Sequence, residues 1–285
     1  MNDLQQYTRI LVTGAGGRLG RLLQGAYRAV CPQQVEVLFA ARSGPSDLPP
    51  FSAEDVPPDL PPVDMVVGLW GVTSGNRAAL DRNRDLVAGT FAAACATGAR
   101  RTLHLSSAAV YGPGADLTES DPMNAATEYG RSKLLMEQAV MQLQSDHCQH
   151  CSIRLANVVG ADSLAPALRS GPALPVTLTR FADGGGPQRS YISPGHLLEV
   201  FCALARLPVA TALPRALNVA AATPVEMEAL ARSAGKEVLW SPATIRDRQT
   251  VTLSTARLRG LLPDLPLNKT AQNMIADWQH AEAHV

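Results

Sequence analysis

The sequence has 285 residues, enough to bury a large core, and its Lys+Arg and Asp+Glu counts are equal at 25 each. This balance excludes a strongly basic surface that would recruit nucleic acid or an anionic membrane. No run of about 18 apolar residues occurs and nothing before Arg9 resembles a signal peptide, so we expect a soluble, cytoplasmic protein. The five cysteines are an odd number in a large chain, which favours free thiols.

The first predicted element is a short apolar strand, residues 9–13, that ends at a glycine-rich loop. The loop, Gly-Ala-Gly-Gly-Arg-Leu-Gly over residues 14–20, leads into an amphipathic helix. Glycines at this place permit a tight turn, close approach of the backbone to a pyrophosphate, and close packing of the helix on the strand. The helix N-terminus also offers free N–H groups to phosphates. The pattern therefore predicts a dinucleotide-binding site.

A second strand is predicted over residues 35–41, and its end bears on the choice of cofactor. A carboxylate here would bind the ribose 2′-hydroxyl of NAD, but the sequence has Ala41, followed by Arg42. Arg18, within the glycine loop, could reach the same position. Two guanidinium groups and no carboxylate favour the 2′-phosphate of NADP. The alternative is that Arg42 only stacks on the adenine ring while NAD binds.

Residues 43–62 predict a loop with at most one degraded strand, because they are rich in proline, serine and aspartate. The next strand is predicted over residues 64–71. Residues 83–98 predict a helix that is apolar nearly all round and ends at Gly98. Such a helix is buried by the sheet or by a partner subunit. We expect it to form a homodimer interface together with the helix that begins at Tyr129.

The centre of the sequence brings together three groups that suit proton transfer. A strand predicted over residues 102–105 delivers Ser107 to its C-terminal end, where ligands bind in open α/β sheets. A helix then begins with Tyr129, and Lys133 lies four residues later on the same face. A hydroxyl, a phenol and an ammonium group can therefore move a proton on and off a secondary alcohol while a cofactor carries the hydride.

The C-terminal half predicts strands at residues 151–155 and 216–220 and surface helices at 226–234 and 270–283. The segment His147–Cys151 could suggest a metal site. Structural zinc needs four ligands, however, and no second pair of similar spacing follows, so we expect a loop and no metal.

Alternating strands and helices predict an α/β protein with a Rossmann-type doubly wound parallel sheet and a small C-terminal substrate-binding lobe. We expect the NAD(P)-binding domain over residues 1–160, with 190–220 returning to it. The substrate-binding lobe is expected over residues 161–189 and 221–285.

Taken together, these motifs resemble the extended short-chain dehydrogenase/reductase family, the NAD(P)-dependent nucleotide-sugar epimerases, dehydratases and related reductases. Residues 13–20 resemble its TGxxGxxG motif, residues 105–112 its SSxxVYG segment, and residues 118–133 the run into its active-site helix. The later motifs RxxNxxG and RDxxH are matched by Arg154, Asn157, Gly160 and by residues 189–192. The resemblance extends from about residue 10 to residue 197 and weakly beyond.

The resemblance implies a role for each matching residue. Tyr129 would be the general acid/base, Lys133 would lower its pKa and hold the nicotinamide ribose, and Ser107 would bind the substrate oxygen. The cofactor would contact Gly14, Gly16, Gly17, Arg18, Leu19, Gly20, Arg42, Leu69, Trp70, Gly71, Asn83, Leu105, Tyr129 and Lys133. The substrate would contact Ser107, Ala108, Asn157 and Arg189.

Departures from the family narrow the chemistry without naming the substrate. The family's 4,6-dehydratases have an Asp-Glu pair, and its decarboxylases a Glu, where this sequence has Ala108 and Ala109. A dehydrogenase or reductase acting on a secondary alcohol or ketone, in particular that of a sugar, is therefore expected. The alternatives are a nucleotide-sugar epimerase similar to UDP-glucose 4-epimerase, with tightly bound NAD, and a non-catalytic NADP-sensing regulator. The short segment 160–189 favours a small polyol, sugar or ketone over a full UDP-sugar.

Overall fold

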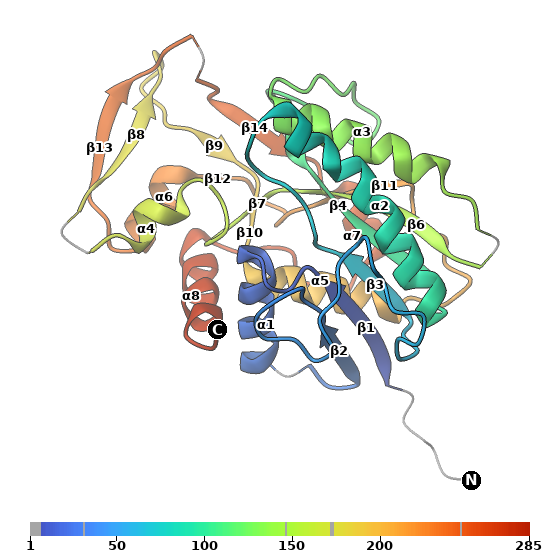
Figure 1. The fold of residues 1–285 in the computed structure, drawn as a ribbon. Helices are drawn as coiled ribbons and strands as arrows, with labels where there is room; N and C mark the ends of the chain where they lie inside the picture. The colour runs from blue at the N-terminus through green and yellow to red at the C-terminus, as the bar shows by residue number, and fades with distance from the viewer. Residues whose placement is uncertain (1–6, 31, 146, 172–173, 246) are drawn as a thin grey trace.

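A six-stranded parallel sheet forms the centre of the protein (Figure 1). The computed structural model describes residues 7–30, 32–145, 147–171, 174–245 and 247–285. The strand order β11-β6-β4-β3-β1-β2 confirms the predicted Rossmann-type doubly wound α/β fold. Its strands are β1 (Thr8–Thr13), β2 (Val35–Phe39), β3 (Met65–Gly68), β4 (Arg101–Ser107), β6 (Gln149–Leu155) and β11 (Ala216–Val219).

The inner strands of this sheet are buried on both faces, as their apolar sequences predict. All four residues of β3 are buried, and in β4 six of seven residues are buried. Leu103, Ile153 and Leu217 from neighbouring strands join one hydrophobic core. Burial on both faces requires helices on each side of the sheet.

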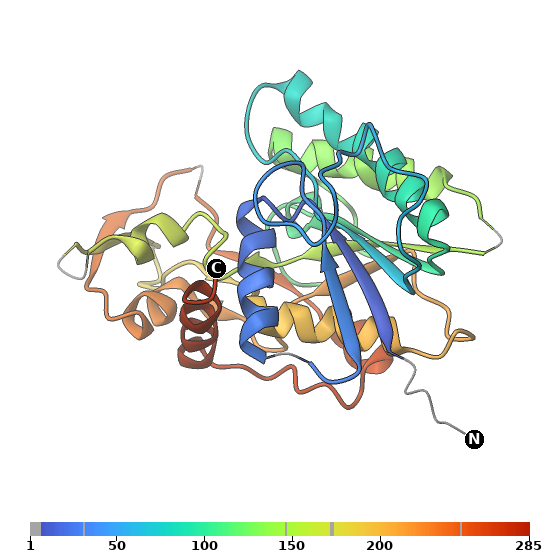
Figure 2. The same cartoon turned by 60° about the horizontal axis from the view of Figure 1, so that its bottom comes forward.

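Two layers of helices cover the sheet (Figures 1 and 2). Helices α2 (Arg77–Thr97) and α3 (Glu128–Gln142) pack together on one face. Helices α1 (Arg18–Val30) and α5 (Pro194–Arg206) pack on the other, with α8 (Ala271–Glu282) beside α1. Helix α2 begins six residues before the predicted start, where Asn76 caps it, and Gly98 ends it at φ 68° as expected. Helix α5 was not predicted, although Pro194 opens it.

A smaller lobe lies beyond the C-terminal ends of the sheet strands. Its four-stranded sheet has the order β12-β9-β14-β5, and two shorter sheets pair β10 with β7 and β13 with β8. Because β5 directly follows β4 and the short 3-10 helix after it, the lobe is joined to that strand. The lobe comprises β5 (Gly114–Leu117), β7 (Asn157–Val158), β8 (Val176–Arg180), β9 (Gln188–Arg189), β10 (Tyr191–Ile192), β12 (Val225–Glu226), β13 (Val238–Pro242), β14 (Thr250–Leu253), α4 (Ala165–Arg169) and α6 (Met227–Ser233). Helix α7 (Ala256–Leu261) instead packs against β11, and Leu258 belongs to the core of the main sheet.

Helix α8 connects the two parts, because it packs against α1 and also against α6 of the lobe. The interaction is close at Gly160, where φ is +85° and an added Cβ would lie 2.1 Å from Trp278 Nε1. The division into a nucleotide-binding domain and a lobe therefore stays a prediction, with α8 in contact with both.

Strand β2 is the edge of the main sheet, because the segment 43–62 contributes only an isolated bridge between Ser52 and Asp55. Side chains accept hydrogen bonds from outward-facing backbone N–H groups of this edge. Val37 N–H donates to the Tyr27 hydroxyl, and Phe39 N–H donates to the Asp47 carboxylate at 2.7 Å. The segment itself packs Phe51, Leu60 and other apolar side chains over the sheet.

In the described part of the chain, no helix is long and apolar enough to cross a membrane. The four cysteines of this part, Cys95, Cys148, Cys151 and Cys202, are free, and Cys31 lies outside the described residues. Within the same residues no three His, Cys, Asp or Glu side chains converge to hold a metal ion.

Candidate functional site

The glycine loop lies in close contact with the end of β3, and this contact explains its composition. Gly14 has φ +69°, and a Cβ there would lie 2.5 Å from the backbone nitrogen of Trp70. A Cβ at Gly20 would lie 2.5 Å from Ala15 Cα, so the first turn of α1 can sit directly on the loop. Because no side chains fill this space, the backbone forms a cradle at a helix N-terminus, which fits a pyrophosphate.

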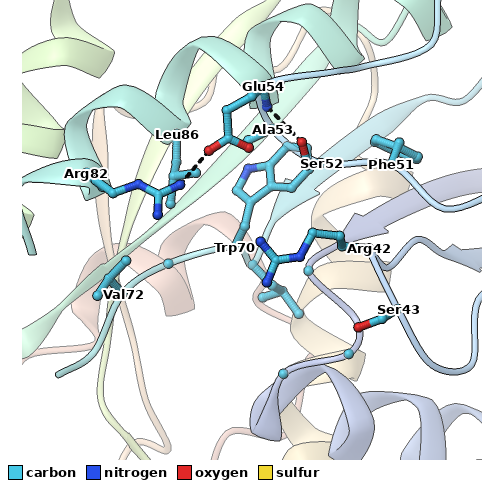
Figure 3. Close-up of a pocket in the computed structure, with 15 residues that line it drawn as sticks. Arg42, Ser43, Phe51, Ser52, Ala53, Glu54, Trp70, Val72, Arg82 and Leu86 are labelled. Atoms are coloured by element: carbon cyan, nitrogen blue, oxygen red, sulfur yellow. Dashed lines mark hydrogen bonds and ion pairs between the residues drawn. The ribbon is translucent and has the colours of Figure 1, made fainter. Parts of the chain in front are cut away.

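A cavity of about 410 Å³ opens beside this cradle (Figure 3). Three of the predicted glycines form one wall, and the end of β3 with the first half of α2 forms another. Of the predicted cofactor residues, it brings together Gly14, Gly16, Gly17, Arg42, Leu69, Trp70 and Gly71. The cavity and its glycine wall therefore fit a dinucleotide such as NAD or NADP.

Several lining residues could not be recognised from the sequence. The loop that follows β2, the segment after β3 and the first half of α2 contribute Ser43, Phe51, Ser52, Ala53, Glu54, Val72, Arg82 and Leu86. The segment 43–62 has no periodicity that would indicate which of its side chains face a ligand. Arg82 stands next to the predicted Asn83, but only the structure shows that it faces the cavity.

The two arginines expected at the adenosine end lie in different places. Arg42 lines the cavity, and Ala41 beside it is buried. Arg18 instead turns toward the lobe, where its Nη1 donates to the carbonyl oxygen of Ala161 at 3.3 Å. Arg18 is therefore placed to link the glycine loop to the chain after β7, and its guanidinium does not accompany Arg42.

Ser107, Tyr129 and Lys133 converge as their spacing predicts. Ser107 ends β4, and its Oγ accepts a hydrogen bond from Ala109 N–H at the start of the 3-10 helix Ala108–Val110. Tyr129 lies in the first turn of α3, which Thr127 caps, and a side-chain hydrogen bond joins it to Ser107. Lys133 Nζ lies 5.8 Å from the centroid of the Tyr129 ring.

The side chain of Lys133 is held by a hydrogen bond to β4. Its Nζ donates to the carbonyl oxygen of Leu105 at 2.7 Å, which explains the predicted involvement of Leu105 through its backbone. Burial lowers the pKa of Lys133 to about 8, while nearby Glu137 raises it. Burial raises the pKa of Tyr129, which the Ser107 hydrogen bond lowers. At neutral pH the resting pair is therefore a phenol beside an ammonium group that loses its proton readily.

Gly71, in the wall of the cofactor cavity, lies next to Lys133. A Cβ at Gly71 would lie 3.5 Å from Lys133 Nζ and 3.3 Å from Asn83 Oδ1. Asn83 holds this backbone in place, because its amide bonds both the N–H and the carbonyl of Val72 at 2.9 Å. Its Nδ2 also donates to Ser132 Oγ on α3 at 3.1 Å. Asn83 therefore joins the cavity wall to the helix that carries Tyr129 and Lys133.

A buried ion pair positions helix α3 against the sheet. Arg154 of β6 and Glu137 of α3 lie 2.9 Å apart, with side chains 5% and 7% exposed. Ser106 also donates to Glu137, and Arg154 donates to the Tyr111 hydroxyl at 2.8 Å. Glu137 is one turn beyond Lys133, so the pair fixes the catalytic side of the helix. The spacing of Lys133 and Glu137 was visible in the sequence, but their partners were not.

The residues expected to contact substrate fall into two groups. Ser107 and Ala108 lie beside Tyr129, whereas Asn157 and Arg189 line a second cavity of about 250 Å³ in the lobe. The Arg189 guanidinium already donates to the carbonyl oxygens of Gln188 and Gln249, both at 2.7 Å, and to that of Arg248. Most of its donors are thus used within the protein, which the sequence did not indicate.

Comparison with known proteins agrees with this geometry. The sequence model described as "NAD dependent epimerase/dehydratase family" matches residues 54–220, more than half of the chain. The chain belongs to this family. It is therefore an enzyme of the extended short-chain dehydrogenase/reductase type that its motifs resemble, and the family is NAD(P)-dependent.

Individual relatives of this epimerase/dehydratase family member extend the comparison. A Kitasatospora kifunensis protein named dTDP-6-deoxy-L-talose 4-dehydrogenase (NAD(P)(+)) is 32% identical over 178 residues, 54% of this chain and 53% of that relative. The match thus spans about half the length of the curated relative.

Two solved structures show the same fold. UDP-N-acetylglucosamine 4-epimerase from Bacillus cereus has a TM-score of 0.77 at 14% identity, over 97% of this chain and 99% of that one. A short-chain dehydrogenase/reductase superfamily protein from Agrobacterium tumefaciens with bound NAD has a TM-score of 0.72 at 21% identity, over 96% and 97%.

The buried ion pair yields a stability prediction. Glu137→Gln should lower the free energy of unfolding by about 3 kcal/mol, because it leaves the Arg154 charge buried without its carboxylate. Urea denaturation measures this change. Glu128→Gln on the same helix is the control, because Glu128 pairs with Arg131 at the exposed surface and should change stability by less than about 1 kcal/mol. Equal effects of the two substitutions would contradict the positioning role.

Proposed function

We propose that the protein is an NAD(P)-dependent oxidoreductase that transfers a hydride at a secondary alcohol or ketone of a sugar or sugar derivative. The observation that supports this proposal most directly is the convergence of Ser107, Tyr129 and Lys133, with Lys133 next to Gly71 in the wall of the cofactor cavity. When bound, the nicotinamide cofactor supplies the hydride chemistry. The protein's own side chains then have to bind the substrate oxygen and move one proton.

Tyr129 is the group we assign to proton transfer. The Tyr129 phenol and the neighbouring Ser107 hydroxyl together present two donors to one substrate oxygen. These donors stabilise the negative charge that develops on that oxygen as the ketone is reduced. The Lys133 ammonium next to the ring favours the phenolate that remains after the proton is donated. Ser107 acts as an orienting donor and Tyr129 as the general acid/base.

The protonation states favour the reductive direction at neutral pH. Burial raises the pKa of Tyr129, so the resting phenol carries the proton that reduction of a ketone requires. Oxidation of an alcohol needs the phenolate instead, and its population grows as the pH rises. We therefore propose ketone reduction as the more efficient direction near pH 7 and alcohol oxidation at alkaline pH.

The residues before Val110 argue against elimination chemistry. Ala108 and Ala109 occupy the positions from which a carboxylate could assist loss of water or carbon dioxide. A simple redox step remains, and the name of the Kitasatospora relative, a 4-dehydrogenase of a dTDP-linked deoxysugar, supports a nucleotide-linked sugar as substrate.

We further propose that NADP(H) is preferred over NAD(H). Arg42 lines the adenosine end of the cavity and forms no hydrogen bond or ion pair among the described residues. Its guanidinium is thus available to a 2′-phosphate. The preceding residue is Ala41, so no carboxylate is present at that position to bind a 2′-hydroxyl.

A homodimer through α2 and α3 is the proposed assembly. The exposed side of α2 carries the small residues Ala88, Ala92 and Cys95, and α3 exposes Met141 to solvent by 56%. Small side chains allow two helices to approach closely, and exposed apolar groups gain stability when a partner covers them. The first half of α2 is more charged than the sequence pattern suggested, with Arg84 and Asp85 exposed.

The proton-transfer role predicts the effect of one oxygen atom. Tyr129→Phe should reduce kcat about 10²–10⁴-fold and leave the cofactor dissociation constant nearly unchanged, because only the phenolic hydroxyl is lost. Steady-state kinetics with fluorescence titration of the cofactor measure both. Tyr7→Phe, at an exposed tyrosine near the N-terminal end of the sheet, serves as the control. Retention of more than about a tenth of the activity by Tyr129→Phe would refute the assignment.

The cofactor proposal predicts that Arg42→Ala removes most of the preference for NADP(H). A charge-assisted hydrogen bond contributes about 1.5–3 kcal/mol, so the affinity for NADP(H) should fall roughly tenfold or more while that for NAD(H) barely changes. Fluorescence titration of both cofactors decides the question. An unmodified protein that prefers NAD(H), or that keeps NAD bound through purification as an epimerase does, would overturn the choice.

The assembly proposal predicts a dimer at micromolar concentration in analytical ultracentrifugation. Ala92→Arg should shift the equilibrium toward monomer, because it places a long charged side chain where the helices of two subunits meet. Ala276→Arg, at an exposed alanine of α8 away from the proposed interface, is the matched control. A clean monomer of the unmodified protein would show that these helices face solvent.

A further inference from the structure

Three charged side chains line the cofactor cavity, and two of them neutralise each other (Figure 3). Glu54 and Arg82 face each other across the cavity wall, with Oε1 and Nη2 2.6 Å apart. Arg42 stands apart from this pair at the adenosine end. Among the described residues that line it, the cavity therefore presents one cation without an ion-pair partner, although a carboxylate is also present.

The loop that carries Glu54 is fixed against α2, so its carboxylate is held at the cavity. Ala53 packs into the notch left by Gly89, where a Cβ would lie 2.4 Å from the Ala53 carbonyl oxygen. Phe51 and Trp70 meet edge to face with their ring centroids 6.1 Å apart. These contacts prevent the backbone at Glu54 from moving away to relieve an unfavourable charge.

Glu54 carries its negative charge at neutral pH. Hydrogen bonds from the Ser52 hydroxyl, its own backbone and Arg82 lower the pKa of its carboxyl. An ionised carboxylate in this cavity would repel a 2′-phosphate and attract the guanidinium of Arg42. Its neutralisation by Arg82 removes both effects.

We propose that Arg82 is a specificity-determining residue that favours NADP(H) over NAD(H) by masking the carboxylate of Glu54. The proposal rests on the cofactor site proposed above and assigns Arg82 an indirect role, through Glu54, with Arg42 as the phosphate ligand. NAD(H) lacks the 2′-phosphate and therefore should be nearly indifferent to the change in charge. The pair keeps both side chains 57% exposed, so screening by solvent limits the effect.

A double-mutant cycle on the pair tests the proposal. Arg82→Gln should lower the ratio of NADP(H) to NAD(H) affinity about 3–10-fold, mainly through weaker NADP(H) binding. Glu54→Gln should leave this ratio unchanged or raise it. In the double substitution Glu54→Gln/Arg82→Gln the ratio should return to that of Glu54→Gln, because no carboxylate then remains to be masked. Fluorescence titration at low ionic strength measures each affinity.

Arg9→Gln provides the matched control. Arg9 and Glu36 form an exposed ion pair of the same 2.6 Å length, with side chains 46% and 41% exposed. The pair lies near the N-terminal ends of β1 and β2, at the other end of these strands from the glycine loop. Its loss should leave the cofactor ratio unchanged. Raising the salt concentration should shrink the effect of Arg82→Gln, because it acts through charge.

The outcomes separate this inference from the cofactor proposal on which it rests. The masking role would be overturned if the double substitution had the same lowered ratio of NADP(H) to NAD(H) affinity as Arg82→Gln alone. Arg82 would then bind the cofactor directly or only support the loop. An equal loss of NADP(H) and NAD(H) affinity in Arg82→Gln would overturn it as well. A starting ratio that favours NAD(H) would contradict the preference for NADP(H), whereas the direction of change in the cycle would still test Arg82.

Discussion

The ion pair between Arg154 and Glu137 is the interaction on which the arrangement of this protein depends. It buries two opposite charges between the sheet and α3, and hydrogen bonds from Ser106 and to Tyr111 satisfy the remaining polar groups. A buried pair of this kind has little tolerance for displacement, since either charge left alone is costly. The angle and height of α3 over β4 are thus fixed, and with them the distance between Lys133 and Tyr129.

The sequence was sufficient to predict the elements that are repeated, apolar and local. The buried strands follow from continuous apolar runs, and the glycine loop follows from the need for residues without side chains between strand and helix. The contact of Gly14 with Trp70 became visible only in the structure. The pairing of Tyr129 with Lys133 follows from helical periodicity. The α/β fold, the family and the enzyme class are confirmed by the comparisons with known proteins. The roles of the individual site residues and the preference for NADP stay predictions.

Positions that depend on long-range contacts could not be predicted. Arg18 follows its glycines in sequence, yet its side chain bonds Ala161, 143 residues away, so proximity in sequence was misleading. Arg189 resembles a ligand-binding arginine, but its guanidinium donates to carbonyl groups of β9 and of the residues just before β14. Glu54 and Arg82 meet only because Gly89 admits the loop onto α2. None of these pairings has a signature in local composition, because each depends on the packing of distant segments.

The uncovered edge of the main sheet has a consequence for the protein's colloidal behaviour. A parallel sheet that ends at β2 would ordinarily offer a template on which a strand of another molecule could extend. The N–H groups of Val37 and Phe39 are instead bound by Tyr27 and Asp47, and the adjoining loop contains prolines that cannot donate to a ladder. Strand β2 therefore offers few free N–H groups to a strand of another molecule, because the side chains of Tyr27 and Asp47 already accept hydrogen bonds from two of them.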